Sequence, residues 1–141
     1  MSFFSSSAMS GSGMSVHRQL MDLISENLAN VNTIKSKDGG PYRRKIGIIG
    51  QKQSNSFGQL LGGKMQNLVY VSGVQRDDSP PRMDYDPNHP LADERGYVSK
   101  PNINVALEMV RMMDATRAYE ANVAVFNASK TMAAKALQIG A

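Results

Sequence analysis

The chain has no cysteine and no tryptophan, and only 6% of its 141 residues are aromatic. The absence of cysteine excludes a disulfide framework and a thiolate metal site, and it leaves the redox compartment open. The scarcity of large aromatic side chains leaves few anchors for an independent interior. We therefore expect one domain of ordinary size that depends on partners for part of its stability.

The sequence also lacks any run of about 18 consecutive apolar residues, so it predicts no transmembrane helix and no direct membrane insertion. Residues 1–13 lack the basic start and the apolar block of a cleaved secretory signal, so we expect any export to follow another route. The formal net charge is +4, but the basic residues are scattered, and only residues 43–45 form a basic run. Nucleic-acid binding is therefore not expected.

Serine and glycine dominate residues 1–13, which hold six Ser and two Gly. Such a composition buries too little apolar surface to offset backbone ordering, so it predicts a flexible segment. From Met14 onward, apolar residues recur three and four positions apart, which predicts a helix over residues 14–34 with one buried stripe. The stripe comprises Val16, Leu20, Leu23, Ile24, Leu28 and Val31.

Glycine and proline interrupt residues 35–101 so often that no helix can persist there. Short β-like runs between these breakers predict a small, irregular β-rich central domain with long loops. The runs cover residues 42–49, 68–75, 82–86 and 97–98. Residues 51–66 are rich in Gln, Ser, Asn and Gly, which is typical either of a mobile loop or of a segment ordered by contact.

A second helix is predicted over residues 102–141, and its apolar residues fall on two faces rather than one. About 35 helical residues form a rod of roughly 50 Å, longer than a domain of this size can cover, so neighbours must bury part of it. The first face comprises Val105, Met109, Met112, Thr116, Tyr119, Val123 and Phe126. The second comprises Leu107, Val110, Ala121, Val125, Ala128, Met132 and Ile139.

These patterns predict a mainly α fold with a small β part, in which the terminal helices pair as an antiparallel, coiled-coil-like hairpin. We expect the first face of residues 102–141 to pack on the stripe of residues 14–34, and the second face to make intersubunit contacts. Charged residues of alternating sign also lie on the second helix, and we interpret them as a solvated face. They are Glu108, Arg111, Asp114, Arg117 and Glu120.

Two alternative functions arise from the remaining residues. The oxygen-bearing side chains of Asp84, Asp86, Asn88, Asp93 and Glu94 resemble a calcium loop, together with His89. The match fails because His89 stands where the loop needs glycine and Arg95 stands where it needs glutamate.

A membrane-surface helix is the other alternative, but acidic residues at 22 and 26 count against it. No catalytic constellation accompanies the two histidines, so we expect no enzyme activity, cofactor or metal.

Residues 25–33, SENLANVNT, resemble the helix-ending signature of flagellar axial rod and hook proteins. The signature residues are Asn27, Leu28, Ala29, Asn30, Asn32 and Thr33. Four further segments are similar to the proximal-rod members of the flagellar basal-body rod family in particular: GGPYRRK at 39–45, SPPRMDYDPNHPLAD at 79–93, GYVSKPNINVALEMV at 96–110 and RAYEANVAVFNASKTMAAKALQIG at 117–140.

The resemblance implies a non-enzymatic structural subunit of the bacterial flagellar proximal rod. Such a subunit polymerises through its terminal helices into the drive shaft that crosses the periplasm and transmits motor torque to the hook and filament. The implied partners are copies of itself, other rod proteins, motor-ring proteins at the rod base, bushing-ring proteins and the type III export apparatus, which exports family members without signal-peptide cleavage. Another axial rod or hook subunit is the alternative within the same family.

Overall fold

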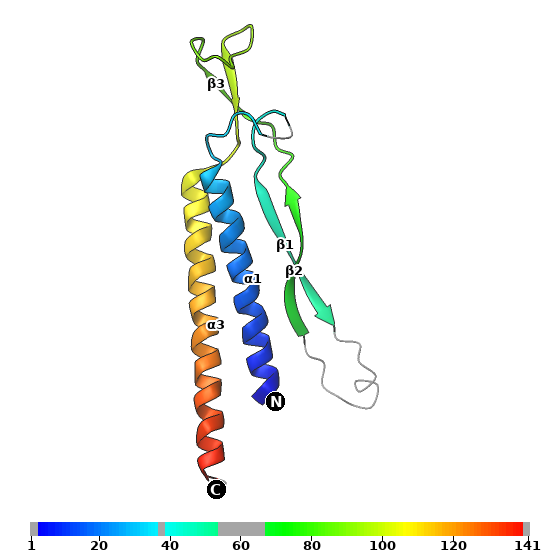
Figure 1. The fold of residues 1–141 in the computed structure, drawn as a ribbon, viewed down its shortest axis with the longest axis vertical. Helices are drawn as coiled ribbons and strands as arrows, with labels where there is room; N and C mark the ends of the chain where they lie inside the picture. Colours follow the sequence, from blue (N-terminus) through cyan, green and yellow to red (C-terminus); the bar gives the residue numbers. More distant parts are fainter. Residues whose placement is uncertain (1–2, 37–38, 54–66, 140–141) are drawn as a thin grey trace.

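Two long antiparallel helices form the body of the molecule, and two β-ribbons complete it (Figure 1). The computed structural model describes residues 3–36, 39–53 and 67–139. In chain order the elements are α1 (Phe3–Ala29), β1 (Lys45–Gln53), β2 (Asn67–Arg76), β3 (Arg82–Tyr85), β4 (Tyr97–Lys100) and α3 (Val105–Ile139). The predicted fold class, a helical hairpin with a small β part between its arms, is confirmed.

Helix α1 begins at Phe3 rather than at Met14, and it ends at Ala29. The prediction of a flexible segment was therefore wrong for residues 3–13, and residues 1–2 lie outside the described residues. Small side chains explain the difference: Ser10 is buried, and Ser6 Oγ lies 3.5 Å from Ser129 Oγ of α3. Since packing against a neighbouring helix outweighs intrinsic propensity, a serine-rich composition does not prevent this segment from being helical.

The contact between α1 and α3 follows positions that alternate by four and three residues, as in a coiled coil. On α1 the buried and half-buried positions are Ser6, Ser10, Gly13, His17, Leu20, Ile24 and Asn27. Opposite them on α3 are Glu108, Met112, Ala115, Tyr119, Asn122, Phe126 and Ser129. We call these two rows the seam. On α1 its lower half is made of the small residues Ser6, Ser10 and Gly13, and the helices approach closely at Gly13: a Cβ atom there would lie 2.9 Å from Asn122 Oδ1.

The seam on α3 is rotated from the predicted pairing face. It shares Met112, Tyr119 and Phe126 with that face, but Val105 and Met109 are 40% and 54% exposed and lie outside it. Thr116 and Val123 are half-buried at its side. At this rotation Ser6, Gly13 and Asn27 of α1 meet Ser129, Asn122 and Glu108 of α3, respectively.

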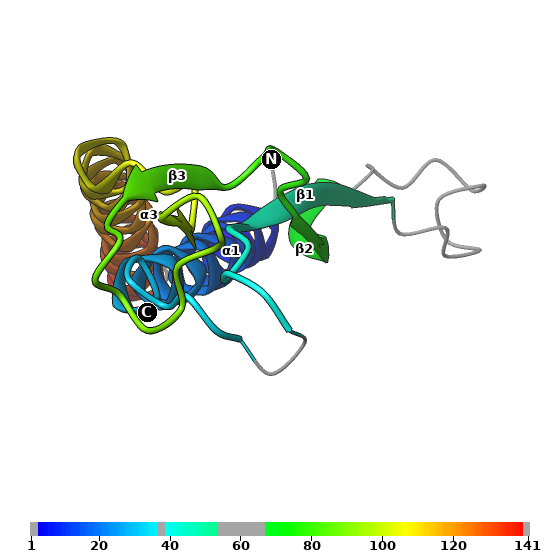
Figure 2. The same cartoon turned by 90° about the horizontal axis from the view of Figure 1, so that it is seen from above.

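Within the subunit α1, not α3, is covered on two sides. Figure 2 shows α1 between α3 and the ribbon of β1 and β2. Val16 and Ile24 are buried, whereas Leu20 and Leu23 also reach the ribbon: a Cβ atom on Gly47 of β1 would lie 2.8 Å from Leu20 Cδ2 and 3.1 Å from Leu23 Cδ1. The remaining stripe residues, Leu28 and Val31, are half-buried.

The β part consists of two separate two-stranded antiparallel sheets rather than one small sheet. Strands β1 and β2 pair from Lys45–Arg76 to Gln53–Asn67, with a bulge between Ile48 and Ile49, and they run along α1. Strands β3 and β4 pair from Arg82–Lys100 to Tyr85–Tyr97 and stand beyond the upper end of the helices (Figure 1). The predicted strand runs are thus found, whereas residues 54–66 of the Gln- and Ser-rich segment lie outside the described residues.

Candidate functional site

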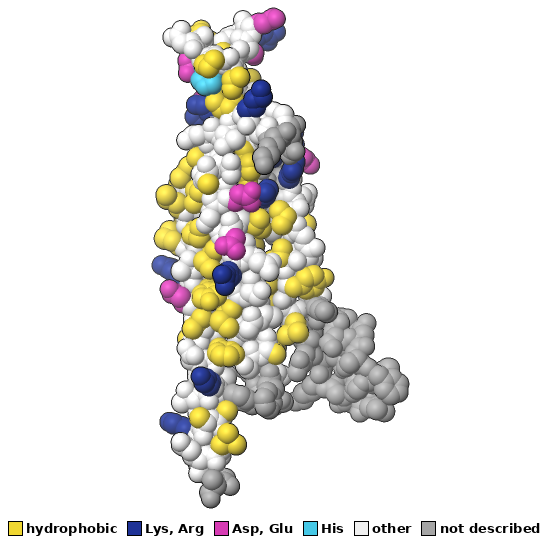
Figure 3. Space-filling model, viewed as in Figure 1, with side chains coloured by type: hydrophobic (Ala, Val, Ile, Leu, Met, Phe, Trp, Pro, Cys, Tyr) yellow, Lys and Arg dark blue, Asp and Glu magenta, His cyan; other side chains and the backbone are white. Residues whose placement is uncertain are grey.

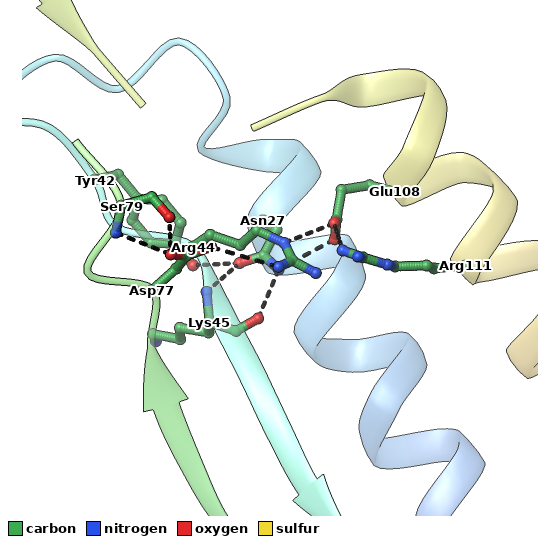
Figure 4. A network of polar contacts seen from close by, with 8 residues as sticks. All are labelled: Asn27, Tyr42, Arg44, Lys45, Asp77, Ser79, Glu108 and Arg111. Atoms are coloured by element: carbon green, nitrogen blue, oxygen red, sulfur yellow. Dashed lines mark hydrogen bonds and ion pairs between the residues drawn. The ribbon is translucent and has the colours of Figure 1, made fainter. Parts of the chain in front are cut away.

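The last turn of α1, the start of β1 and the first turn of α3 meet at a buried polar junction (Figure 4). Asn27, 1% exposed, stands at its centre. Its Nδ2 donates hydrogen bonds to Lys45 O (2.9 Å) and to Glu108 Oε2 (3.2 Å). Its Oδ1 accepts from Lys45 N (2.9 Å) and from Tyr42 Oη (3.0 Å). The amide therefore uses both donors and both acceptor sites, and one side chain joins three segments of the chain.

Glu108, also 1% exposed, supplies the negative charge of the junction. Its Oε1 accepts hydrogen bonds from Arg44 Nε and from Arg111 Nη1, each at 2.7 Å. Arg44 Nη1 lies a further 3.6 Å from Asp77 Oδ2. A carboxylate taken out of water needs such partners, and removing one of them leaves the buried charge only partly compensated.

This arrangement corrects the interpretation of the alternating charges on α3 as a solvated face. Glu108 belongs to the seam and Arg111 is half-buried against it, whereas Asp114, Arg117 and Glu120 are exposed as expected. Sequence reasoning missed the two junction residues because a charged side chain is normally assigned to solvent. The position of Glu108 in the sequence could have indicated its burial, because it stands four residues before Met112 and so shares the spacing of the seam residues.

Two neighbouring groups have shifted titration behaviour. Hydrogen bonds from the hydroxyl and backbone N–H of Ser79 lower the pKa of Asp77 below its ordinary value, with a smaller contribution from Arg44. Burial raises the pKa of Tyr42 to about 12, and the nearby negative charge of Glu26 adds to the increase. The Tyr42 phenol therefore remains a hydrogen-bond donor to Asn27 at neutral pH.

The signature residues that follow Asn27 end α1 and turn the chain towards the junction. Asn30 Nδ2 donates to Glu26 O (2.9 Å), and Thr33 Oγ1 donates to Asn30 Oδ1 (3.1 Å). Tyr42 N then donates to Thr33 O (3.0 Å), which returns the chain to the helix end. Of the other signature residues, Leu28 is half-buried, and Ala29 and Asn32 are exposed.

The second predicted face of α3 is open. Leu107, Val110, Ala121, Val125, Ala128 and Met132 are all exposed, and the side chain of Ile139 lies outside the described part. Figure 3 shows hydrophobic side chains along the outer side of the helix pair. Among the described helices and strands, α3 packs only on α1, so its outer surface has no intrasubunit cover. Its assignment to intersubunit contacts stays a prediction.

The acidic loop considered as a calcium site forms local contacts instead. Asp84 is bound by Lys100 and Arg82, which lower the pKa of its carboxyl. Asp93 Oδ1 accepts the backbone N–H groups of Arg95 (2.9 Å) and Tyr97 (2.8 Å). Within the described ranges, no three His, Cys, Asp or Glu residues gather as a metal site would require. No described helix has the length and apolar character needed to cross a bilayer.

Comparisons with known proteins agree with this architecture. A family model described as "Flagellar basal body rod FlgEFG protein C-terminal" matches residues 94–139. The "Flagellar basal-body rod protein FlgC" of Borreliella burgdorferi is 41% identical, with 99% of this chain and 98% of the relative covered. The proteins of the same name in Bacillus subtilis (41%, 99% of each chain) and Salmonella typhimurium (37%, 92% of each chain) are similar along the same length. The chain therefore belongs to the FlgC family of flagellar basal-body rod proteins.

Proposed function

We propose that this chain is a structural subunit of the bacterial flagellar proximal rod, without catalytic activity, and that it polymerises through its terminal helices into the shaft that transmits motor torque to the hook and filament. The observation that carries the proposal is similarity to FlgC proteins over 99% of the chain, in a molecule whose longest helix is covered on one side only.

One face of α3 packs on α1 and the other is exposed, and this arrangement supports a mechanical role. The seam and the polar junction fix α3 against α1, so the subunit behaves as a stiff body. The outer face, with Leu107, Val110 and Val125, is available to neighbours. Burying one large apolar side chain contributes roughly 1.5 to 3 kcal/mol, so a few such contacts per neighbour hold subunits firmly. Since the outer face and the surface that receives it differ, the contact is heterologous and extends into a helical array.

The proposed location is the flagellar basal body, with the rod in the periplasm and the subunit exported through the type III apparatus without signal-peptide cleavage. The proposed partners are other rod proteins and further copies of this chain. Motor-ring proteins at the rod base and bushing-ring proteins are proposed as additional neighbours. Their contacts follow from membership of the family rather than from a particular surface of this subunit.

Deleting the gene and purifying basal bodies tests the proposal. The deletion strain is expected to lack a complete rod and to be non-motile, and the wild-type chain supplied from a plasmid should restore both. Purified alone, the chain should be monomeric and should retain the pairing of α1 and α3. A motile deletion strain with normal basal bodies would overturn the proposal.

A further inference from the structure

The ribbon of β3 and β4, which we call the tip, stands at the opposite end of the molecule from the C-terminal end of α3 (Figure 1). Successive side chains of each strand point to opposite faces of the tip, so the tip has two faces of different composition. One face carries the fully buried Val98 together with Asp84, which binds Lys100 at 2.8 Å and Arg82 at 3.0 Å. The ion pair between Asp84 and Lys100 holds the two strands of the tip together. The opposite face carries Met83, Tyr85, Tyr97 and Ser99.

This opposite face is aromatic and exposed. Met83, Tyr85 and Tyr97 are 50%, 68% and 40% exposed, and the two tyrosine rings meet edge to face at 5.2 Å. Among the described elements β3 and β4 contact only each other, so no described helix and no other described strand covers this face. Tyrosine offers a large contact area at little cost in side-chain entropy, and it is enriched where binding energy concentrates.

The aromatic rings are also held in place. Gly96, with φ of +79°, lets the chain turn so tightly that a Cβ atom there would lie 3.1 Å from Tyr85 Cε2 and 3.2 Å from Pro87 Cβ. Ser99 Oγ lies 3.3 Å from Met83 Sδ on the same face. The face is thus preorganised rather than collapsed onto the body, which lowers the entropic cost of binding a partner.

Acidic residues border the aromatic face. The connection between β3 and β4 contains Asp86, Asp93 and Glu94, all exposed, against a single basic residue, Arg95. A partner that presents apolar and basic side chains together would therefore match the tip in both respects.

The C-terminal end of α3, at the opposite end of the molecule from the tip, presents both apolar and basic side chains. Ser6 lies against Ser129, so the last turns of α3 run beyond the start of α1. From residue 121 to residue 139 the helix has no acidic residue, and it carries Lys130 and Lys135. Met132 and Leu137 in the same segment are 62% and 76% exposed. Beyond Ser129 the exposed side of the helix is basic and apolar, with Lys130, Met132, Lys135 and Leu137.

We propose that the aromatic face of the tip receives the basic, apolar C-terminal end of the helix of the rod subunit that lies next along the rod axis. The inference rests on the proposed function, because it requires subunits that share one orientation. In such a polar array the tip of one subunit faces the helix end of the next, so the two unlike surfaces meet in a heterologous contact that repeats without closing. The acidic border sets the register of the basic helix end.

A photo-crosslinking amino acid in place of Tyr85, introduced into the full-length chain in living cells, tests the contact. After irradiation and purification of basal bodies, the crosslink is expected within about the last twenty residues of a rod subunit, because that length corresponds to the final five turns or so of the helix. A second copy and a different rod protein are distinguished by mass spectrometry of the crosslinked peptide. The same amino acid at Asp22, which is exposed on α1, serves as the matched control and should not give this crosslink.

The outcomes separate this inference from the proposed function. If the chain is absent from purified basal bodies, the proposed function is wrong and the inference with it. If the chain is present but Tyr85 crosslinks to another part of a rod subunit, to a ring protein or to nothing, only the inference is wrong.

Charge reversal gives an independent test that does not depend on crosslinking chemistry. The variant with Asp86→Lys and Glu94→Lys should weaken the contact about tenfold, which corresponds to roughly 1.4 kcal/mol, and swimming should fall. If the crosslink joins two copies of this chain, the further changes Lys130→Glu and Lys135→Glu reverse the charge of the helix end as well. Swimming should then be restored, because the two surfaces again carry opposite charges. Swimming that is unaffected by the first change, or not restored by the second, would contradict the contact.

Discussion

Asn27 is the residue on which the subunit's internal geometry most depends. Its side chain binds the backbone at Lys45, the phenol of Tyr42 and the carboxylate of Glu108, so it fixes the end of α1 relative to β1 and α3 at once. Residues of other shape cannot repeat this pattern, because it needs two donors and two acceptors in one plane. The role of Asn27 in the helix-ending signature is therefore to join elements rather than to cap a helix.

The change Asn27→Asp tests this role with little change in volume. It replaces a donor by a carboxylate oxygen about 3.2 Å from Glu108 Oε2, so attraction becomes repulsion. Amide hydrogen exchange of the purified chain near the junction should accelerate at least about tenfold, which corresponds to roughly 1.4 kcal/mol. Asn32→Asp, at an exposed position of the same signature, should have little effect. Equal behaviour of the two variants would contradict the assignment.

Tyr42 gives the junction a dependence on alkaline pH. Its pKa is raised from 10.0 to about 12 by burial, so the folded state keeps a proton that the unfolded chain releases. The resulting stabilisation is complete below pH 10.0 and is lost as the pH rises through about 12. The helical circular dichroism of the wild type should fall in this range, and that of Tyr42→Phe should fall less. Identical alkaline profiles of the two proteins would show that the phenol is not part of the junction.

Gly47 is required by the close approach of β1 to α1. A valine there would force its Cβ to within 2.8 Å of Leu20 Cδ2, and overpacking of this kind costs about 1 to 3 kcal/mol. Hydrogen exchange along β1 and β2 should accelerate in Gly47→Val. Gly73→Val is the matched control in the partner strand, because no heavy atom lies within 4 Å of a Cβ atom there. A larger effect at Gly73 than at Gly47 would contradict the packing of the ribbon on α1.

At the scale of elements, periodicity was sufficient for the helical hairpin and for the positions of the strands. It placed Leu20 and Ile24 in the seam, and it assigned Leu107, Val110 and Val125 to a face that the structure leaves exposed. Large apolar residues that repeat every three or four positions define a helix face directly, whereas the partner that covers the outer face of α3 stays a prediction.

The start of α1 and the phase of α3 could not be predicted in this way. The α1 side of the lower half of the seam consists of Ser6, Ser10 and Gly13, and none of these residues contributes to an apolar pattern. The polar junction was missed for a related reason. The burial of Glu108 depends on Arg44 and Asn27, which are distant in sequence, so only the folded chain brings the compensating groups together.

The exposed face of α3 can be tested separately from the seam. Val125→Asp puts a charge on the outer face without touching α1, so the subunit should still be exported, whereas assembly should fail because a carboxylate would be buried between subunits. Purified basal bodies should lack a complete rod, and the cells should not swim. Val123→Asp, at a half-buried position beside the seam, should instead disturb the subunit itself. Normal motility of the Val125→Asp strain would contradict the role of the outer face.

At the scale of the whole molecule, the fold separates the contacts that close the subunit from those available to neighbours. α1 lies at the centre, with α3 on one side and the β1–β2 ribbon on the other (Figure 2). Most of the large apolar side chains that remain exposed lie along α3, on the β1–β2 ribbon and on the tip. An elongated subunit with free surfaces along its side and at its ends suits a polar shaft, in which each subunit has lateral and axial neighbours.

Electron cryo-microscopy of the intact basal body, at a resolution that shows side chains, would show whether α3 uses one face within the subunit and the other between subunits. We expect α1 and α3 of one chain to remain paired, with Asn27 against Glu108 and Ser6 against Ser129. We also expect neighbouring subunits to cover Leu107, Val110 and Val125. An outer face of α3 that is open to solvent in the assembled rod would contradict this arrangement, and so would an α1 that pairs with the α3 of another subunit.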